Sequence, residues 1–224
     1  MVNEVLIVIP TRNRWDKLVR CLDSIPAHDW IKVCVVCDAD GITHERLMLE
    51  FGYSTIQRPN RFSALIQQHS GSVHCRNWAT QHLVLDSALM ATDDVEFHMN
   101  SIEMARWWMN EKFPDGDGVI GFTQEPNKFH KTGVCLVGAK FLDRYPNRWL
   151  YNPDYFHFAC PEILWLAEKY DKFFQSPDSE VHHKVPRKDD GDIDQTHWDA
   201  RMKKPFDFGK LEQRKKDGKV WPLD

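Results

Sequence analysis

The chain has 224 residues, of which 42% are hydrophobic and 28% are charged, and its formal net charge is −4. This composition is typical of a globular protein with one core, and the net charge argues against a general nucleic-acid-binding protein, which normally carries a basic face. No apolar run reaches the roughly 18 residues that a membrane span requires, and the N-terminus lacks the features of a signal peptide. The six cysteines lie mostly within apolar runs, as reduced thiols do, so we expect a cytoplasmic protein.

The first third of the chain alternates between predicted strands and predicted helices. Residues 4–10 and 32–37 are aliphatic runs that predict strands buried on both faces, and residues 15–25 between them predict an amphipathic helix. A helical stretch at 43–51 leads into a short predicted strand at 53–57. This alternation predicts a parallel sheet with right-handed crossover connections.

The alternation continues as far as residue 186. Beyond that point the periodicity is poor, and we expect residues 187–224 to form a charged tail that is draped over the domain or partly disordered. The further helices are predicted at 73–86, 101–112 and 161–170, and the further strands at 89–92, 119–122 and 134–137.

Polar clusters follow three of these strands. Residues 10–13 follow the first strand and residues 38–40 follow the second. Asp93 and Asp94 come after the strand at 89–92. Ligands of open α/β sheets bind beyond the carboxyl ends of the strands, so we expect the three clusters to line one crevice. Adjacent carboxylates repel each other and suit a hard divalent cation, although aspartates are also common in plain turns.

Three further positions have both a structural and a functional interpretation. Arg76 begins a predicted helix, where it is either an exposed first-turn residue or a contact for a nucleotide phosphate. His182 and His183 are either surface residues or the source of an imidazole that completes a Mn²⁺ shell. Glu162 in a first helical turn is favoured by the helix dipole, which would also keep it ionised as a general base.

Several segments together resemble the family 2 glycosyltransferases with the GT-A fold. VLIVIPTRNRWDKLVRCLDSI resembles the opening strand and helix of that family, and VCVVCDADG resembles its second strand, whose terminal aspartate binds the nucleotide base. GSVHCRNWAT resembles the helix start beside the nucleotide, FACPEILWLAEKYDKF the acceptor-side helix with the catalytic carboxylate, and SPDSEVHHKVP the late segment with a metal-binding histidine. LMATDDVEF stands where the family has its Asp-x-Asp metal motif, with Thr92 in place of the first acid. The segments keep the family order and cover residues 4–186.

The resemblance implies an α/β domain of the GT-A fold at residues 1–186, with a mainly parallel sheet flanked by helices and a small acceptor-side β/α half. The implied activity is inverting transfer of a sugar, as in hexosyltransferases, from a nucleotide sugar, specifically a UDP-sugar, to an acceptor hydroxyl. The acceptor stays open among glycans, proteins, small molecules and hydroxylated nucleic-acid bases. A nucleotidyltransferase and an inactive nucleotide-binding module of the same fold remain alternatives. The first usually opens with a glycine-rich phosphate loop, which IPTRNRWDK lacks.

The same resemblance implies roles for individual residues. Glu162 would act as the general base, with Asp154 as the next choice. Asp94 and His182 would hold Mn²⁺ or Mg²⁺ on the diphosphate, and Asp38 would hold the base of the nucleotide. The other candidates for nucleotide and diphosphate binding are Pro10, Thr11, Arg12, Asp40, Arg76 and Asp93.

Overall fold

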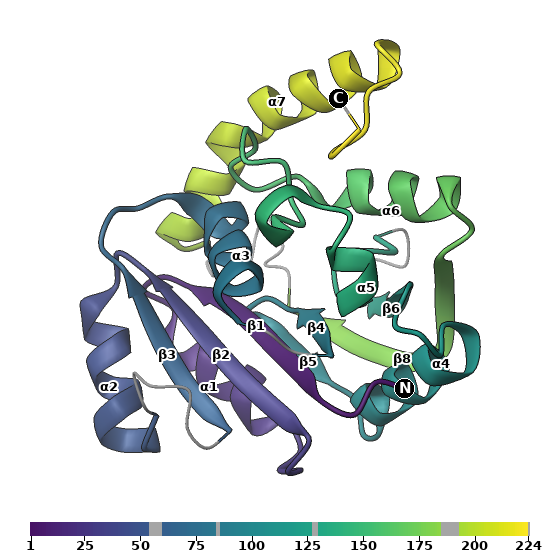
Figure 1. Cartoon of the computed structure of the whole chain (residues 1–224). Coiled ribbons are helices and arrows are strands. Elements are labelled where there is room, and N and C mark those ends of the chain that lie inside the picture. The colour runs from purple at the N-terminus through teal and green to yellow at the C-terminus, as the bar shows by residue number, and fades with distance from the viewer. Residues whose placement is uncertain (54–59, 84–85, 127–129, 185–192, 224) are drawn as a thin grey trace.

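Eight strands of the described residues form a single sheet. The computed structural model describes residues 1–53, 60–83, 86–126, 130–184 and 193–223. The strand order across the sheet is β3-β2-β1-β4-β7-β6-β8-β5 (Figure 1). The strands are β1 (Val5–Thr11), β2 (Ile31–Asp38), β3 (Arg61–Ile66), β4 (Ser87–Met90), β5 (Val95–Phe97), β6 (Val119–Glu125), β7 (Cys135–Gly138) and β8 (Phe173–His183).

The pairing of the strands places three strand ends at one edge. β1 runs parallel to β2 and to β4, and β2 runs parallel to β3. β7 is antiparallel to both β4 and β6, whereas β8 is parallel to β6 and antiparallel to β5. The predicted α/β class with a mainly parallel sheet is confirmed. Because β1, β2 and β4 share one direction, the polar residues that follow them meet at the same edge.

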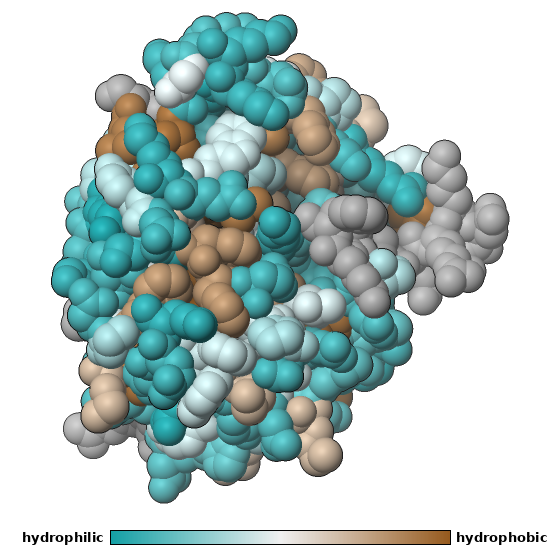
Figure 2. All heavy atoms as spheres, turned by 90° about the vertical axis from the view of Figure 1, so that its right-hand side faces the viewer, coloured by the Kyte–Doolittle hydropathy of each residue, from teal (hydrophilic) through white to brown (hydrophobic). Residues whose placement is uncertain are grey.

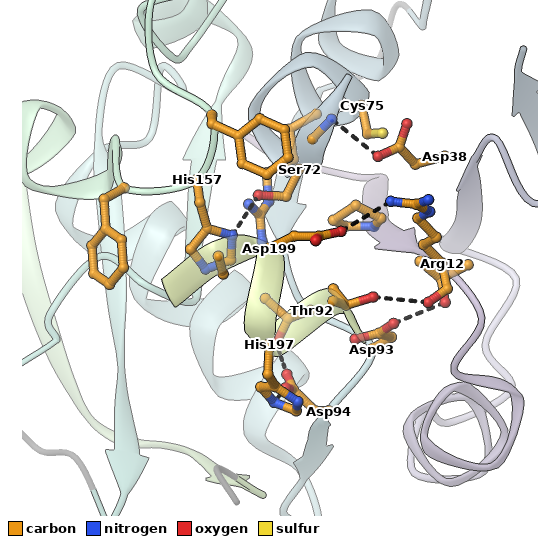
Figure 3. Close-up of a pocket in the computed structure, with 18 of the residues that line it drawn as sticks. Arg12, Asp38, Ser72, Cys75, Thr92, Asp93, Asp94, His157, His197 and Asp199 are labelled. Carbon is orange, nitrogen blue, oxygen red and sulfur yellow. Dashed lines mark hydrogen bonds and ion pairs between the residues drawn. The ribbon is translucent and has the colours of Figure 1, made fainter. Parts of the chain in front are cut away.

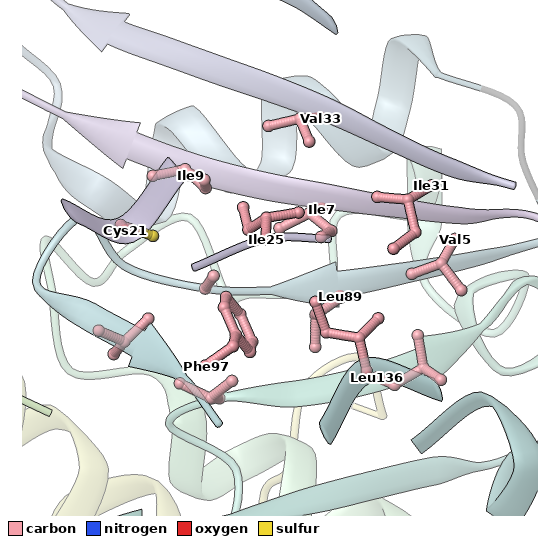
Figure 4. Packing of buried hydrophobic residues seen from close by; sticks show 14 of the residues in the cluster. Val5, Ile7, Ile9, Cys21, Ile25, Ile31, Val33, Leu89, Phe97 and Leu136 are labelled. Atoms are coloured by element: carbon pink, nitrogen blue, oxygen red, sulfur yellow. The ribbon is translucent and has the colours of Figure 1, made fainter. Parts of the chain in front are cut away.

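Helices cover both faces of the sheet, and β1 divides its side chains between the two cores. Val5, Ile7 and Ile9 pack with α1, α2 and α4 on one face (Figure 4). Leu6 and Val8 pack with α3, α5 and α6 on the other face. The helices are α1 (Trp15–Asp23), α2 (Gly41–Phe51), α3 (Gly71–His82), α4 (Ser101–Lys112), α5 (Ala139–Leu142), α6 (Cys160–Lys169) and α7 (Gln195–Lys216), with a 3₁₀ turn at Pro146–Arg148.

The side of the molecule to the right in Figure 1 carries α4 and β8, and it closes the first core. Trp108 of α4 lies against Phe174 of β8, with ring centroids 4.6 Å apart, and both rings pack against that core. The Lys112 ammonium lies 4.9 Å from the Phe174 ring centroid. Figure 2 shows this side, on which hydrophilic residues surround a hydrophobic area.

Strand β8 was not predicted, because its sequence lacks the features that indicate a strand. Pro177 lacks a backbone N–H, and a proline normally argues against a paired strand. The ladder with β6 runs to Gln175 and resumes at Glu180, so residues 176–179 leave the pairing and accommodate the proline. Strand β3 was also not predicted, and the strand predicted at 53–57 lies mostly outside the described residues.

The C-terminal tail contains the long helix α7, which the poor periodicity did not indicate. The Asp194 side chain caps it by accepting the His197 N–H at 3.0 Å. Only Asp207 and Leu211 of this helix are buried. Figure 1 shows α7 as the outermost helix, at the top of the molecule, and its first turns contact Arg12 at the end of β1. A division of the chain at residue 186 remains a prediction.

None of the described helices combines the length and the apolar character needed to cross a lipid bilayer.

Candidate active site

A cavity of about 350 Å³ opens at the carboxyl ends of β1, β2 and β4. Residues from all three strand ends, from α3 and from α7 line it, and Figure 3 shows their side chains converging. The crevice expected from the strand ends is therefore present. The lining includes seven residues singled out from the sequence, namely Pro10, Thr11, Arg12, Asp38, Arg76, Asp93 and Asp94.

Asp38 ends β2, and the backbone holds its carboxylate at the cavity wall. Its two oxygens accept the N–H groups of Ser70 at 2.9 Å and Gly71 at 3.0 Å, and Oδ2 lies 2.6 Å from His69 Nδ1. Gly71 has φ +83°, and a Cβ there would lie 2.7 Å from the Phe156 carbonyl oxygen, so no other residue fits this approach. The carboxylate is fixed in orientation and keeps acceptor capacity for a ligand N–H.

Asp40 does not line the cavity, so the geometry does not support its predicted role in nucleotide binding. Its carboxylate caps α2 by accepting the Thr43 N–H at 3.1 Å and also accepts the Asn13 N–H at 2.6 Å. Ala39 between the two aspartates has φ +53°, in the left-handed region. This turn directs Asp38 into the cavity and Asp40 towards α2.

Arg14 forms ion pairs with Asp93 and Asp94, the two adjacent aspartates of the LMATDDVEF segment. Its guanidinium lies 2.5 Å from Asp93 Oδ1 and 2.9 Å from Asp94 Oδ2. A third carboxylate, that of Asp194 before α7, accepts from Arg14 Nε at 2.8 Å. The Thr11 hydroxyl donates to the other oxygen of Asp93 at 2.8 Å. Arg14 is only 8% exposed, so the charges of the aspartates are compensated inside the protein.

The pKa values of the two aspartates move in opposite directions. Burial raises the pKa of Asp93, against the charge of Arg14, and the neighbouring charge of Asp94 raises it further. Burial also acts to raise the pKa of Asp94, but hydrogen bonds from His183 and His197 and the charge of Arg14 hold it well below its usual range. Asp94 is therefore the more firmly ionised of the two and the better ligand for a cation.

Strand β8 brings His183, and not His182, to Asp94. His183 Nε2 lies 3.2 Å from Asp94 Oδ1, and His183 lines the cavity. His182 pairs with Glu96 in the β5–β8 ladder and does not line the cavity. Consecutive residues of a strand point to opposite faces, which explains why only one of the pair reaches the site. The geometry favours His183 over His182 as the candidate ligand, and a metal-binding role for either stays a prediction.

Comparisons with known proteins agree with this architecture. No protein-family model and no curated protein matches the sequence. A mannosyltransferase from Pyrobaculum calidifontis, solved in complex with GDP-Man and Mn²⁺, matches 100% of this chain with a TM-score of 0.71 at 16% identity. GalNAc-T7 with UDP, GalNAc and Mn²⁺ matches 84% with a TM-score of 0.65 at 14% identity, and TarS of S. aureus matches 81% with 0.63 at 13%.

The chain has the GT-A fold. It spans 67% of the mannosyltransferase, 45% of GalNAc-T7 and 37% of TarS. At these low identities the likeness concerns the fold, so residue roles rest on the geometry of this chain.

Two of these GT-A structures contain Mn²⁺, and the cavity offers a matching pair of donors. Asp94 Oδ1 and His183 Nε2 combine a carboxylate with an imidazole, which suits Mn²⁺. Arg14 takes the other oxygen of Asp94, while Thr92 donates its hydroxyl to Oδ1 at 2.6 Å. Within the described ranges no three His, Cys, Asp or Glu side chains surround a metal position. The residues thus fit a cation whose shell is completed by ligand oxygens and water.

Neither carboxylate predicted as the base lines the cavity. Glu162 is 3% exposed, accepts from the Tyr155 hydroxyl at 2.9 Å and the Trp221 N–H at 3.1 Å, and forms an ion pair with Arg214 at 2.5 Å. Asp154 is exposed to solvent in the loop before α6. The helix-dipole interpretation of Glu162 omitted Arg214, because that partner lies on α7, far away in the sequence. The contacts of Glu162 are those of a buried ion pair, and its role as the base stays a prediction that they do not support.

Sequence reasoning missed several residues that line the cavity, and many of them belong to helix α7. Helix α7 supplies one wall, and its Asp199 carboxylate lies 3.1 Å from Arg12 Nη1 (Figure 3). The charged composition of the tail was the only signal, and it equally suits a solvated surface. The missed lining residues include Arg14, His69, His157, Thr196, His197, Asp199, Arg201 and Lys204.

His157, in the loop before α6, is a neutral imidazole in the cavity wall. Its Nδ1 lies 3.1 Å from the Ser72 hydroxyl (Figure 3). Burial lowers the pKa of His157 to about 4, and the charge of Arg76 lowers it in the same direction. The ring is therefore uncharged at neutral pH, and it is a weaker base than an ordinary histidine.

Proposed function

We propose that the protein transfers a sugar from a nucleotide diphosphate sugar, with UDP as the nucleotide, to an acceptor hydroxyl with inversion. One observation carries the proposal: Asp38, Arg76 and the pair Asp94–His183 come from four separate segments and line one cavity of a GT-A fold. A base-reading carboxylate, a guanidinium and a cation-binding pair are the groups that a nucleotide diphosphate requires. The glycosyltransferases with the same fold support the reaction class.

The nucleotide end of the cavity is assigned to Asp38 and Arg76. Asp38 would accept an N–H of the uracil, since its backbone partners already fix its direction. Arg76 donates from Nη2 to the Ala91 carbonyl at 2.9 Å, and its buried Nε has no hydrogen-bond acceptor among the described residues. A buried donor without a partner is costly, so a nucleotide oxygen near this guanidinium would stabilise it. Pro10, Thr11 and Arg12 form the wall at the end of β1.

The diphosphate end is assigned to Asp94 and His183. A divalent cation bound there would offset the negative charge that grows on the leaving diphosphate. Asp94 remains ionised through its hydrogen bonds and the charge of Arg14, so it is ready to bind a cation without first losing a proton. Arg14 and Thr92 also fix the carboxylate in place, which avoids reorganisation during the reaction.

His157 is assigned as the base that accepts the proton of the acceptor hydroxyl. This residue lines the cavity and is neutral, whereas Glu162 is occupied by Arg214 outside it. Replacing His157 by glutamine should lower turnover by about 10²-fold or more while the affinity for UDP stays unchanged. Steady-state kinetics with calorimetric UDP binding measures both quantities.

The matched variant Glu162→Gln should behave in the opposite way. Turnover should be retained, while the free energy of unfolding should fall by about 1.5–3 kcal/mol, because the charged hydrogen bonds to Arg214 are weakened. A large loss of turnover with unchanged stability would instead return the role of base to Glu162.

UDP binding is the direct test of the proposed function. Calorimetry with Mn²⁺ should detect UDP and its sugars, and Asp38→Ala should weaken UDP binding by about 1–3 kcal/mol, the cost of an unmade hydrogen bond in a buried site. Asp40→Ala removes the cap of α2 and should lower stability by about 1 kcal/mol without a matching loss of UDP affinity. Tighter binding of GDP than of UDP would reject uridine as the nucleotide, and no binding of either would reject the proposal.

A further inference from the structure

Helix α7 presents an apolar stripe to the solvent. Trp198, Met202 and Phe206 are spaced four residues apart, so they lie along one face of the helix. Their side chains are 51%, 69% and 70% exposed. Large apolar residues in a contiguous exposed stripe are uncommon in proteins without a partner at that surface.

The inner face of the same helix buries one apolar residue, Leu211, beside several polar groups. The Asp207 carboxylate accepts the backbone N–H groups of Phe156, His157 and Phe158 at 3.1, 2.9 and 3.0 Å. Arg214 on this side pairs with the buried Glu162. A helix that packs on a protein normally buries its large apolar side chains, whereas three of those on α7 face the solvent. The stripe therefore does not serve the packing of this domain.

Basic residues border the stripe. At roughly 100° per residue, Arg201 lies on one flank, and Lys203 and Lys210 lie on the other, beyond Asp199. The Lys210 ammonium also donates to the Asp154 carbonyl. All three are exposed. Within Gln195–Lys216 there are seven basic and three acidic residues, a net charge of +4, in a chain whose formal net charge is −4. The exposed apolar helix thus carries a net positive charge in a chain whose net charge is negative.

We propose that the outer face of α7 binds the surface of an anionic lipid membrane. An interfacial helix requires an apolar face with aromatic residues that enters the headgroup region and basic residues beside it that attract anionic lipids. The α7 stripe has this composition, and its position as the outermost helix leaves it accessible (Figure 1). A nucleic-acid surface fits less well, because the centre of the stripe is uncharged whereas phosphate contacts dominate such surfaces. Arg201 also lines the cavity, so the membrane would lie beside the proposed active site.

Vesicle flotation of the full chain tests this proposal. The protein should float with vesicles that mix phosphatidylcholine and phosphatidylglycerol, and only weakly with phosphatidylcholine alone. The double variant Met202→Ser and Phe206→Ser should bind at least about tenfold more weakly, because two apolar side chains no longer enter the lipid. Lys203→Ala should weaken binding about fivefold on the anionic vesicles only, since a basic residue near such a surface is worth about 1 kcal/mol.

Controls keep the experiment decisive. Met99→Ser removes a methionine that is 89% exposed in the loop before α4, and it should leave flotation unchanged. Because Met202 and Phe206 are exposed, their replacement by serine should leave the thermal unfolding midpoint unchanged. A loss of binding then cannot be attributed to misfolding. Wild-type protein that fails to float, or a double variant that floats like the wild type, overturns the proposal. Binding of an oligonucleotide or self-association that depends on the same residues, without flotation, overturns it in favour of that partner.

Discussion

Arg14→Met should lower the free energy of unfolding by about 3–5 kcal/mol, the usual cost of breaking a buried ion pair on one side. Burial opposes the charge of Arg14, but the carboxylates of Asp93, Asp94 and Asp194 nevertheless raise its pKa above the usual range. Methionine keeps the apolar stem of the side chain but removes the guanidinium and its charge. Two buried aspartates and the start of α7 then lose their shared partner. Urea unfolding at neutral pH, followed by circular dichroism, measures the change.

A matched arginine provides the control for this prediction. Arg12 pairs with Asp199 at 3.1 Å, and both side chains are about one-quarter exposed. Arg12→Met should therefore cost only about 0–1 kcal/mol, as is typical of solvent-screened pairs. Equal losses for the two variants would mean that the buried position of Arg14 adds nothing to stability.

Asp94→Ala should reduce transfer by about 10³–10⁴-fold and abolish the enhancement of UDP binding by Mn²⁺. The expectation rests on the proposed function. A Lewis acid on the leaving diphosphate contributes several kcal/mol to transition-state stabilisation, and each 1.36 kcal/mol is about a factor of ten in rate. Asp94 supplies the oxygen that faces His183 at 3.2 Å, so alanine removes half of the donor pair. Turnover and Mn²⁺ affinity, the latter from paramagnetic resonance, measure the two effects.

The two adjacent histidines give this prediction its internal control. His183→Ala should resemble Asp94→Ala, because His183 lines the cavity, whereas His182→Ala should retain Mn²⁺ binding and turnover. The pair differs by one position in β8, so the comparison also tests the register of that strand. Full UDP binding and turnover in EDTA would contradict the role of a cation at Asp94.

Local patterns in the sequence were sufficient for the central sheet and for one side of the site. The runs at Val5–Thr11 and Ile31–Asp38 consist mostly of aliphatic residues, as is typical of strands buried on both faces. Parallel neighbouring strands end at one edge, so the positions of Thr11, Asp38 and Asp94 after their strands already implied a shared crevice. These inferences depend on short-range periodicity and on a general rule of sheet geometry.

The tertiary structure alone decided which of several similar residues enters the site. Asp38 and Asp40 differ in direction because Ala39 takes a left-handed conformation, and His182 and His183 differ because β8 pairs in one register. A shift by one residue would exchange the two histidines, and nothing in the sequence near them determines that register.

Contacts distant in the sequence decided the remaining features. Helix α7 is held to the domain largely by polar contacts, such as Asp207 with the loop at 156–158 and Asp194 with Arg14. Its one buried apolar residue, Leu211, is too little for periodicity to reveal. The same helix carries Arg214, which turns Glu162 from a candidate base into a buried ion-pair residue. A sequence pattern reports which face of an element is apolar, but the partner of a buried charge depends on the folded chain.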